Sequence, residues 1–274
     1  MARPLRICVP GGLYHVIARG NARDRIYLED DDRSRFLATF ARVVERFGWL
    51  CHAYCLMDNH YHLVVETPQP NLPAGMRQLN GVYAQGFNER HDRCGHVFQA
   101  RYRSILVEKE SHLLAVCRYV VLNPVRAGVC SEARAYRWSS YAATSGQGPA
   151  ERFLTTDWLL GNFAGTRAAA QARYRAFIGA GADEALVERI RGERFGSEPF
   201  LRKRFGGDPP LAEIPRVQIE PIRPTLEEIF ELIPDAPVAA AFRRHAYTLR
   251  EIGEYLDCHY STVSRRLRRE ETTA

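Results

Sequence analysis

Hydrophobic and polar positions follow two different periods along the first half of the chain. Short runs of apolar, β-branched and aromatic residues predict four strands, at residues 13–19, 49–56, 60–65 and 102–107. Over residues 30–47 and 111–123 the apolar residues recur every three or four positions, and this pattern predicts helices. Residues 73–90 show a weaker pattern of the same kind, so a third helix is expected there.

The order of these elements predicts an α+β fold. The chain runs strand, helix, strand, strand, helix, strand, helix, and Asp58 and Asn59 form a turn between the two middle strands. A central hairpin makes the sheet antiparallel, with the helices on one face, so we expect a ferredoxin-like plan. The last helix is expected to end after Asn123, because Pro124 disfavours helical backbone in the residue before it.

Composition changes after residue 145. Residues 145–225 are rich in Gly and Ala, with helices expected at 168–177 and 183–191, and a cluster of prolines before residue 225 marks a linker. The sequence therefore predicts three parts. These are an α+β domain over residues 1–145, a helical extension with a Pro-rich linker over 146–224, and a helical domain over 225–274.

The bulk composition narrows the possible functions. The 274 residues carry 38 Lys and Arg against 32 Asp and Glu, and the excess is rich in Arg, which favours phosphate-bearing partners. Seven cysteines without a Cys-x-x-Cys pair argue against a disulfide framework or a zinc ribbon. No apolar run approaches about 18 residues and no signal-peptide pattern is present, so we expect a cytoplasmic protein without a membrane partner.

Two histidines stand on the predicted strand 60–65. Alternate residues of a strand share a face, so His60 and His62 point the same way. Two imidazoles side by side form half of a divalent-metal site. The alternative is two polar residues on the solvent-exposed face of an edge strand, and the spacing alone does not separate the two interpretations.

A second pair lies on the predicted helix 111–123. Tyr119 and Asn123 are four residues apart, so both project from one face of the helix. A phenolic oxygen can act as a nucleophile, and a neutral amide oxygen can complete a metal site with two histidines. The alternative is that Tyr119 packs in the core and that Asn123 is an ordinary residue at the end of the helix.

Several motifs together resemble those of a known family. They are MDNHYHL at residues 57–63, FNER at 87–90, GHVFQARYRS at 95–104, YVVLNPVRAG at 119–128 and WSSY at 138–141. This combination resembles the REP-associated tyrosine transposases, a branch of the single-tyrosine HUH transposases. The resemblance covers residues 10–145 well and the later chain more loosely.

The resemblance implies a DNA transposase and endonuclease. Such an enzyme cuts and rejoins single-stranded DNA, including REP-like hairpins, through a 5′-phosphotyrosine intermediate. By this resemblance Tyr119 is the nucleophile, His60 and His62 are metal ligands, and Asn123 is the third ligand. Tyr61 stands where the HUH motif usually has an aliphatic residue, and we expect it to face the other side of the sheet.

The expected cofactor is Mg²⁺ or Mn²⁺. Two imidazoles and one amide oxygen suit Mn²⁺ better than Mg²⁺, which prefers oxygen ligands, so Mn²⁺ should bind more tightly. Tyr83 is a competing nucleophile on another predicted helix. Phe87 occupies the position four residues after it, where a metal ligand would be needed.

Two other functions are compatible with parts of the pattern. A rolling-circle replication-type HUH nuclease shares the two histidines and the tyrosine, but it usually carries larger accessory regions. A DNA-binding regulator that has lost catalysis would share the fold, although all four catalytic positions hold competent residues here. The sequence leaves open whether the protein is a monomer or a homodimer.

Residues 87–104 combine basic and aromatic side chains. Four arginines, Arg90, Arg93, Arg101 and Arg103, are interleaved with His, Phe and Tyr. This composition suits single-stranded DNA, because cations follow the phosphates and rings stack on the bases. The alternative is a solvated loop, and the family resemblance favours DNA.

The tail has the features of a helix-turn-helix. Thr248 and Glu251 form a predicted capping box, residues 257–259 a turn, and residues 260–269 a second helix with four arginines. The side chains expected to meet base edges or phosphates are Ser261, Thr262, Ser264, Arg265 and Arg268. The alternative is a basic amphipathic helix that ends the chain.

Overall fold

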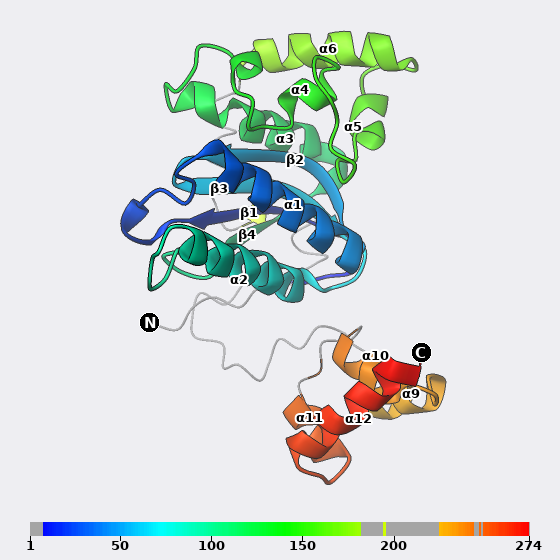
Figure 1. Cartoon of the computed structure of the whole chain (residues 1–274). Helices are drawn as coiled ribbons and strands as arrows, with labels where there is room; N and C mark the ends of the chain where they lie inside the picture. The colour runs from blue at the N-terminus through cyan, green and yellow to red at the C-terminus, as the bar shows by residue number, and fades with distance from the viewer. Residues whose placement is uncertain (1–7, 182–193, 196–224, 244–246, 248, 274) are drawn as a thin grey trace. The chain divides into compact units, whose positions relative to one another are not determined.

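Strand β3 (His60–Thr67) lies inside a sheet rather than at its edge (Figure 1). It pairs antiparallel with β2 (Leu50–Met57) on one side and with β1 (Gly12–Arg19) on the other. Beyond β1 follow β4 (Arg103–Val107), also antiparallel, and the short β5 (Arg194–Phe195), which is parallel to β4. The α+β prediction with a ferredoxin-like antiparallel sheet is confirmed.

The structure is a computed structural model that describes residues 8–181, 194–195, 225–243, 247 and 249–273. It divides into two compact units. The larger holds Gly11–Pro68 and Leu72–Pro209, and the smaller holds Pro210–Ala274 with Met1–Pro10 and Gln69–Asn71. The helix expected at 183–191 lies outside the described residues. The helix expected at 168–177 is present as α6 (Arg167–Gly179).

Helices cover both faces of the sheet, and not one face as the pattern suggested. Tyr61 of β3 contacts Phe36 of α1 (Asp30–Phe47), and its hydroxyl donates to Asn80 of α2 (Leu72–Arg90). Its neighbour His62 points to the opposite face and contacts Tyr119 of α3 (Lys109–Arg126). Because successive strand residues alternate in direction, α3 lies across the sheet from α1 and α2.

Helix α3 packs in a hydrophobic core to which α4 (Tyr141–Thr144), α5 (Asp157–Gly161) and α6 also contribute side chains. Buried residues from the sheet and α3 form the centre of this cluster; they include Leu13, Val64, Ile105, Leu113, Cys117 and Val120. The opposite face is rich in aromatic contacts between β3, α1 and α2. The two cores together bury β1 and β3 on both sides and fix the register of their polar side chains.

Pro124 does not end α3, so the prediction of a helix end after Asn123 is wrong. The helix continues to Arg126, and Gly128 then takes a positive φ of 69°. Pro124 has no N–H for the carbonyl of Val120. The side-chain amide of Asn123 supplies a donor instead, at 3.4 Å from Val120 O and 2.9 Å from Tyr119 O.

In the smaller unit the described residues form four helices, α9 (Leu226–Leu232), α10 (Pro237–Arg243), α11 (Leu249–Tyr255) and α12 (Tyr260–Thr273). They pack around Ile229, Val238, Ala241, Ile252 and Val263. Asp257, with φ of 49°, turns the chain between α11 and α12. The predicted cap Thr248 lies outside the described residues, whereas Thr225 and Glu228 form a capping box on α9 that the sequence analysis missed.

Among the helices that the structure describes, none is both long and apolar enough to span a membrane.

Candidate functional site

His60 and His62 share one face of β3, and their ring centroids lie 5.0 Å apart. His60 is half-buried and His62 is buried, with 4% of its surface exposed. The alternative of two polar residues on an exposed edge strand is therefore excluded, because β3 is an interior strand. Nδ1 of His60 lies 2.7 Å from Asn59 Oδ1, which leaves Nε2 of His60 without a hydrogen bond among the described residues.

Tyr119 of α3 faces the same two histidines. Its ring is perpendicular to that of His62, with centroids 5.9 Å apart, and the guanidinium of Arg126 lies 5.2 Å from its centroid. In the part of the chain that the structure describes, its phenolic oxygen makes no hydrogen bond. Tyr83 lies elsewhere: its hydroxyl donates to Ile26 O within the aromatic core.

Asn123 lies one helical turn after Tyr119. Its nitrogen donates to Tyr119 O and Val120 O, so the amide is held in one orientation and Oδ1 is left as the free acceptor. The assignment of oxygen and nitrogen follows from this hydrogen bonding. Two imidazole nitrogens and one amide oxygen are consequently available at one place.

These side chains line one open groove with a volume of about 450 Å³. Its lining residues come from β1, β3, α3, the start of β4 and the segment before it; they are Ile17, Ala18, Arg19, His60, His62, Gln99, Ala100, Arg101, Arg103, Tyr119 and Asn123. The structure thus brings together all four predicted catalytic residues and two of the four predicted arginines of the 87–104 segment.

The segment before β4 reaches the groove because it extends the sheet beyond the end of β1. Asn21 N donates to Val97 O at 2.9 Å, and Gln99 N donates to Arg19 O at 3.0 Å. These bonds place the side chains of Gln99 and Arg101 at the rim of the groove.

Burial keeps the histidines of the groove neutral. It lowers the pKa of His60 to about 4, with a smaller contribution from Arg19. Burial also places the pKa of His62 well below its ordinary value, and the neighbouring His15 adds to this effect. A neutral imidazole has a lone pair, so neither residue has to lose a positive charge before it binds a metal ion.

Sequence reasoning missed two residues of β1: Arg19, which lines the groove, and His15, which lies behind His62. His15 is 1% exposed, and its Nε2 lies 2.9 Å from Nδ1 of His62. Arg19 is paired with His60 in the register of β1 and β3. Both lie on the same face of β1 as Ile17, and this spacing of two residues could be read from the sequence. Their position beside β3 could not, since it depends on which strands pair.

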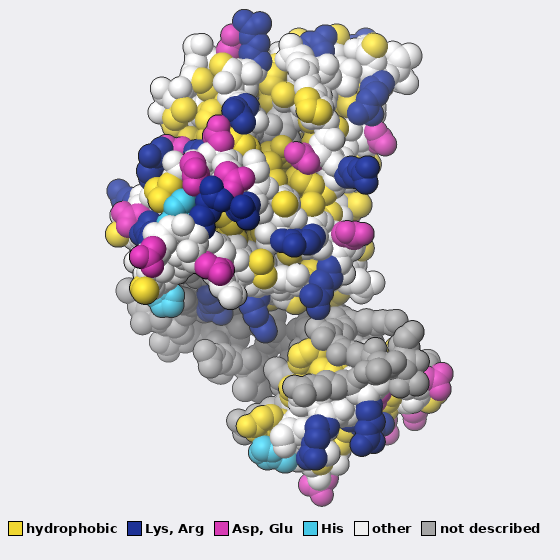
Figure 2. Space-filling view, in the orientation of Figure 1, with side chains coloured by type: hydrophobic (Ala, Val, Ile, Leu, Met, Phe, Trp, Pro, Cys, Tyr) yellow, Lys and Arg dark blue, Asp and Glu magenta, His cyan; other side chains and the backbone are white. Residues whose placement is uncertain are grey.

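Arg90 and Arg93, also predicted to contact DNA, do not line the groove. Arg90 donates to Glu29 Oε1 at 2.7 Å and also pairs with Asp31, while Arg93 lies 3.8 Å from Asp24. On the face of the larger unit shown in Figure 2, acidic and basic side chains lie next to one another. These two arginines are engaged within the protein.

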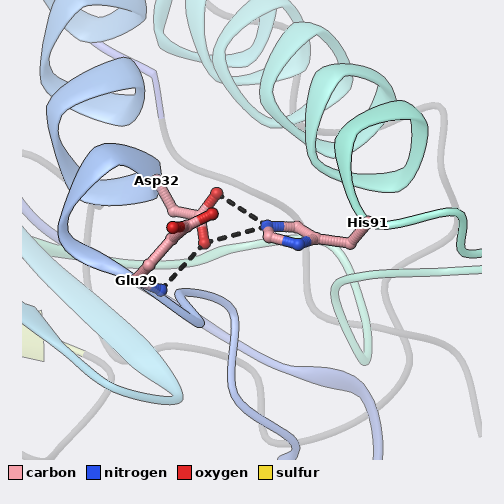
Figure 3. Close-up of side chains that lie close together, drawn as sticks. All are labelled: Glu29, Asp32 and His91. Carbon is pink, nitrogen blue, oxygen red and sulfur yellow. Dashed lines mark hydrogen bonds and ion pairs between the residues drawn. The ribbon is translucent and has the colours of Figure 1, made fainter.

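A separate cluster of Glu29, Asp32 and His91 offers possible ligand atoms within 4.8 Å of one another (Figure 3). Asp32 already accepts from the main-chain nitrogens of Leu28 and Glu29 and lies 2.8 Å from His91 Nε2. The guanidinium of Arg90 contacts Glu29 and opposes a second cation there. These contacts join the start of α1 to the end of α2.

The predicted DNA-contacting residues of the tail lie on α12. Ser261, Thr262 and Arg265 are exposed, Ser264 is half-buried, and Arg268 belongs to the same helix. A shallow pocket of about 380 Å³ at the start of α12 is lined by Leu249, Tyr260, Ser261, Ser264 and Arg265. The first two turns of α12 therefore present polar and basic side chains together.

The known proteins to which this chain is similar are named as transposases. Residues 8–123 match the family described as "Transposase IS200 like". A REP-associated tyrosine transposase of Haemophilus influenzae is 23% identical over 148 residues, which cover 48% of this chain and 80% of the relative.

Two solved structures are also similar. One is a REP-associated tyrosine transposase bound to a REP hairpin, with 14% identity, a TM-score of 0.47, and coverage of 57% of this chain and 92% of that chain. The other is a transposase from Deinococcus radiodurans, with 18% identity, a TM-score of 0.31, and coverage of 47% and 91%.

Proposed function

Because residues 8–123 match the IS200-like transposase family, we propose that this chain cuts and rejoins single-stranded DNA through a covalent bond to Tyr119. The observation that carries the proposal is the common groove: His60 and His62 enter it from β3, and Tyr119 and Asn123 enter it from α3. A packing tyrosine and two solvated histidines would not need to converge in this way.

The donor set fits a divalent cation. Within the described residues, Nε2 of His60, Nε2 of His62 and Oδ1 of Asn123 form no hydrogen bond, and both imidazoles are neutral. When bound there, a divalent ion would polarise the scissile phosphate. Two nitrogens and one oxygen match Mn²⁺ better than Mg²⁺, which prefers an all-oxygen shell.

The chemistry of Tyr119 is a phosphoryl transfer. Its phenolic oxygen forms a bond to phosphorus while the bond from phosphorus to the 3′ oxygen breaks. The phenol loses its proton, the departing 3′ oxygen gains one, and the 5′ phosphate remains on Tyr119. No water is consumed, so the reverse reaction with a new 3′ hydroxyl rejoins the strand.

Arg19, Arg101 and Arg103 line the same groove, and they supply positive charge for a DNA backbone. A single strand suits this groove, because phosphates and unpaired bases can both enter an open and polar channel. The name of the Haemophilus influenzae relative suggests REP-type hairpins as the substrate class. The α11–α12 pair would act as a helix-turn-helix that contacts DNA separately.

A regulator without catalytic activity is not favoured. Such a protein would have no need for an unbonded phenol, two neutral imidazoles and an amide oxygen at one place. The larger accessory regions of replication nucleases also have no counterpart among the described residues.

The decisive experiment is trapping of the covalent adduct. Wild-type protein, Tyr119→Phe and Tyr83→Phe are incubated with a labelled hairpin oligonucleotide and Mn²⁺, and adducts are separated on a denaturing gel. Wild type and Tyr83→Phe should form the adduct, and Tyr119→Phe should bind the DNA without forming it. An adduct with Tyr119→Phe that Tyr83→Phe lacks would refute the assignment.

A further inference from the structure

His15 lies directly behind the metal-ligand candidate His62. It projects from β1 toward α3, its ring is stacked on that of His62 with centroids 5.1 Å apart, and Tyr119 packs edge-on against it at 5.6 Å. The 2.9 Å contact between His15 Nε2 and His62 Nδ1 is a hydrogen bond between two buried rings. His15 does not line the groove itself, so its influence must pass through its neighbours.

The bond between the two rings constrains both tautomers. Both rings are buried, with 1% and 4% of their surfaces exposed, and burial disfavours the charged form, so each ring carries one N–H. If Nε2 of His62 binds a metal ion, the proton of His62 must sit on Nδ1. His15 Nε2 must then accept that proton's hydrogen bond, and the proton of His15 must sit on its own Nδ1.

The surroundings of His15 favour the opposite tautomer when no metal is bound. Its Nδ1 is buried, and it has no hydrogen-bond partner among the described residues. A buried N–H without an acceptor is more costly than a buried lone pair without a donor. His15 is therefore expected to keep its proton on Nε2 and donate to His62.

We propose that His15 is a positioning residue that sets the metal affinity of His62 by coupled tautomer exchange. Metal binding requires both rings to move their proton to Nδ1, and it leaves one buried donor unpaired. The proposal rests on the metal site of the proposed function. The hydrogen-bond acceptor for the metal-bound histidine is here an imidazole. In other metal sites it is usually a carboxylate, a backbone carbonyl or a water molecule.

Substitutions at His15 separate positioning from packing. His15→Phe keeps a stacked ring but cannot accept the hydrogen bond that orients His62 and raises its basicity, so Mn²⁺ affinity should fall by about 10- to 100-fold. His15→Gln offers an oxygen acceptor that requires no tautomer change and leaves no imidazole N–H unpaired, so it should bind Mn²⁺ more tightly than wild type. His52→Phe is the matched control, because His52 is equally buried and bonds to Glu66 on β3.

Binding of Mn²⁺ to the full chain is measured from the electron paramagnetic resonance signal of the free ion. Circular dichroism confirms that each variant is folded. The expected result is a loss of affinity in His15→Phe, a gain in His15→Gln and no change in His52→Phe. Equal affinity of His15→Phe and wild type would overturn the proposal and leave the proposed function standing. Failure of wild type to bind Mn²⁺ would overturn both.

Nitrogen-15 spectra of wild-type histidines give a test that does not depend on the folding of a variant. Without metal, the proton of His15 should be on Nε2. With Zn²⁺ as a diamagnetic probe, His62 and His15 should both be protonated on Nδ1. A tautomer of His15 that does not change, or a nitrogen shift showing that His15 itself binds Zn²⁺, would overturn the proposal.

Discussion

Asn123 donates a hydrogen bond of 2.9 Å from its side-chain nitrogen to the main-chain oxygen of Tyr119. The nucleophile and the third metal-ligand candidate are thereby joined within one turn of α3. The same nitrogen also reaches Val120 O, which Pro124 leaves without its usual donor. The proline next to the ligand thus favours the orientation in which Oδ1 remains free.

Pro124→Ala should therefore weaken the site without weakening the fold. Alanine restores the main-chain N–H to Val120 O, so α3 should be at least as stable as in wild type. The amide of Asn123 then loses one of its two acceptors and can rotate, so Mn²⁺ affinity and adduct formation should fall several-fold.

Thermal unfolding and Mn²⁺ titration of Pro124→Ala and wild type check this expectation. Pro237→Ala is a suitable control, since Pro237 lies in the first turn of α10, where proline is compatible with a helix. Unchanged or tighter Mn²⁺ binding by Pro124→Ala would contradict the orienting role of the proline.

His62→Ala and His60→Ala should differ in stability even if both abolish metal-dependent cleavage. His62 is buried and bonded to His15, so its removal leaves a cavity and an unpaired ring nitrogen. We expect a loss of about 1–3 kcal/mol in the free energy of unfolding for His62→Ala and a smaller loss for the half-buried His60.

Urea unfolding of the two variants measures this difference, and cleavage assays with and without EDTA measure the metal requirement. The sequence analysis placed both histidines on an exposed or a ligand-bearing face and did not distinguish them. Equal stability of the two variants would show that the bond to His15 contributes nothing to the fold.

The parts of the site that the sequence predicted are those set by local geometry. Spacing of two on a strand and four on a helix placed His60 with His62 and Tyr119 with Asn123 on common faces. Their convergence came from the family resemblance. His15 was not predicted, because its contact with His62 depends on the pairing of β1 with β3.

Composition was a weaker guide than spacing. It treated Arg90 and Arg101 alike, although Arg90 is held by Glu29 and Asp31 and Arg101 lines the groove. The rule that proline ends a helix failed at Pro124 because a neighbouring side chain replaced the missing donor. In both cases a side-chain partner that the pattern does not include decided the outcome.

Glu66 should make stability depend on pH in the acid range. The hydrogen bond from His52, followed by that from Lys109, lowers the pKa of Glu66 below its ordinary value of 4.5. The folded state then binds a proton less readily than the unfolded state. Ionised Glu66 consequently stabilises the fold above about pH 4.5, and this stabilisation is lost as pH falls through the lower, folded pKa.

Glu66→Gln should be less stable than wild type by about 1 kcal/mol at pH 7, and the difference should shrink toward pH 3. Urea unfolding at both pH values measures it. Glu45→Gln serves as the control, because Glu45 is exposed on α1. A gap between wild type and Glu66→Gln that stays constant with pH would show that the charge of Glu66 is not the source of its effect.

The tail, residues 225–274, should bind DNA without taking part in the chemistry. It belongs to a separate compact unit with its own core, and α12 presents Ser261, Thr262 and Arg265 to solvent. Deleting the tail should weaken affinity for DNA, while Mn²⁺-dependent cleavage of a short hairpin remains detectable at high protein concentration.

Arginines of α12 allow a sharper test than deletion. Arg265 is exposed, whereas Arg266 pairs with Glu270 at 3.1 Å and lies over the ring of Phe230. If Arg265 contacts a phosphate, Arg265→Ala should reduce the slope of log affinity against log salt concentration by about one, and Arg266→Ala should change it less.

Binding of full-length protein, both variants and the truncated chain to the same DNA across a salt series provides the comparison. Identical affinities and slopes for all four would mean that the tail does not contact DNA, and its function would then be packing or dimerisation.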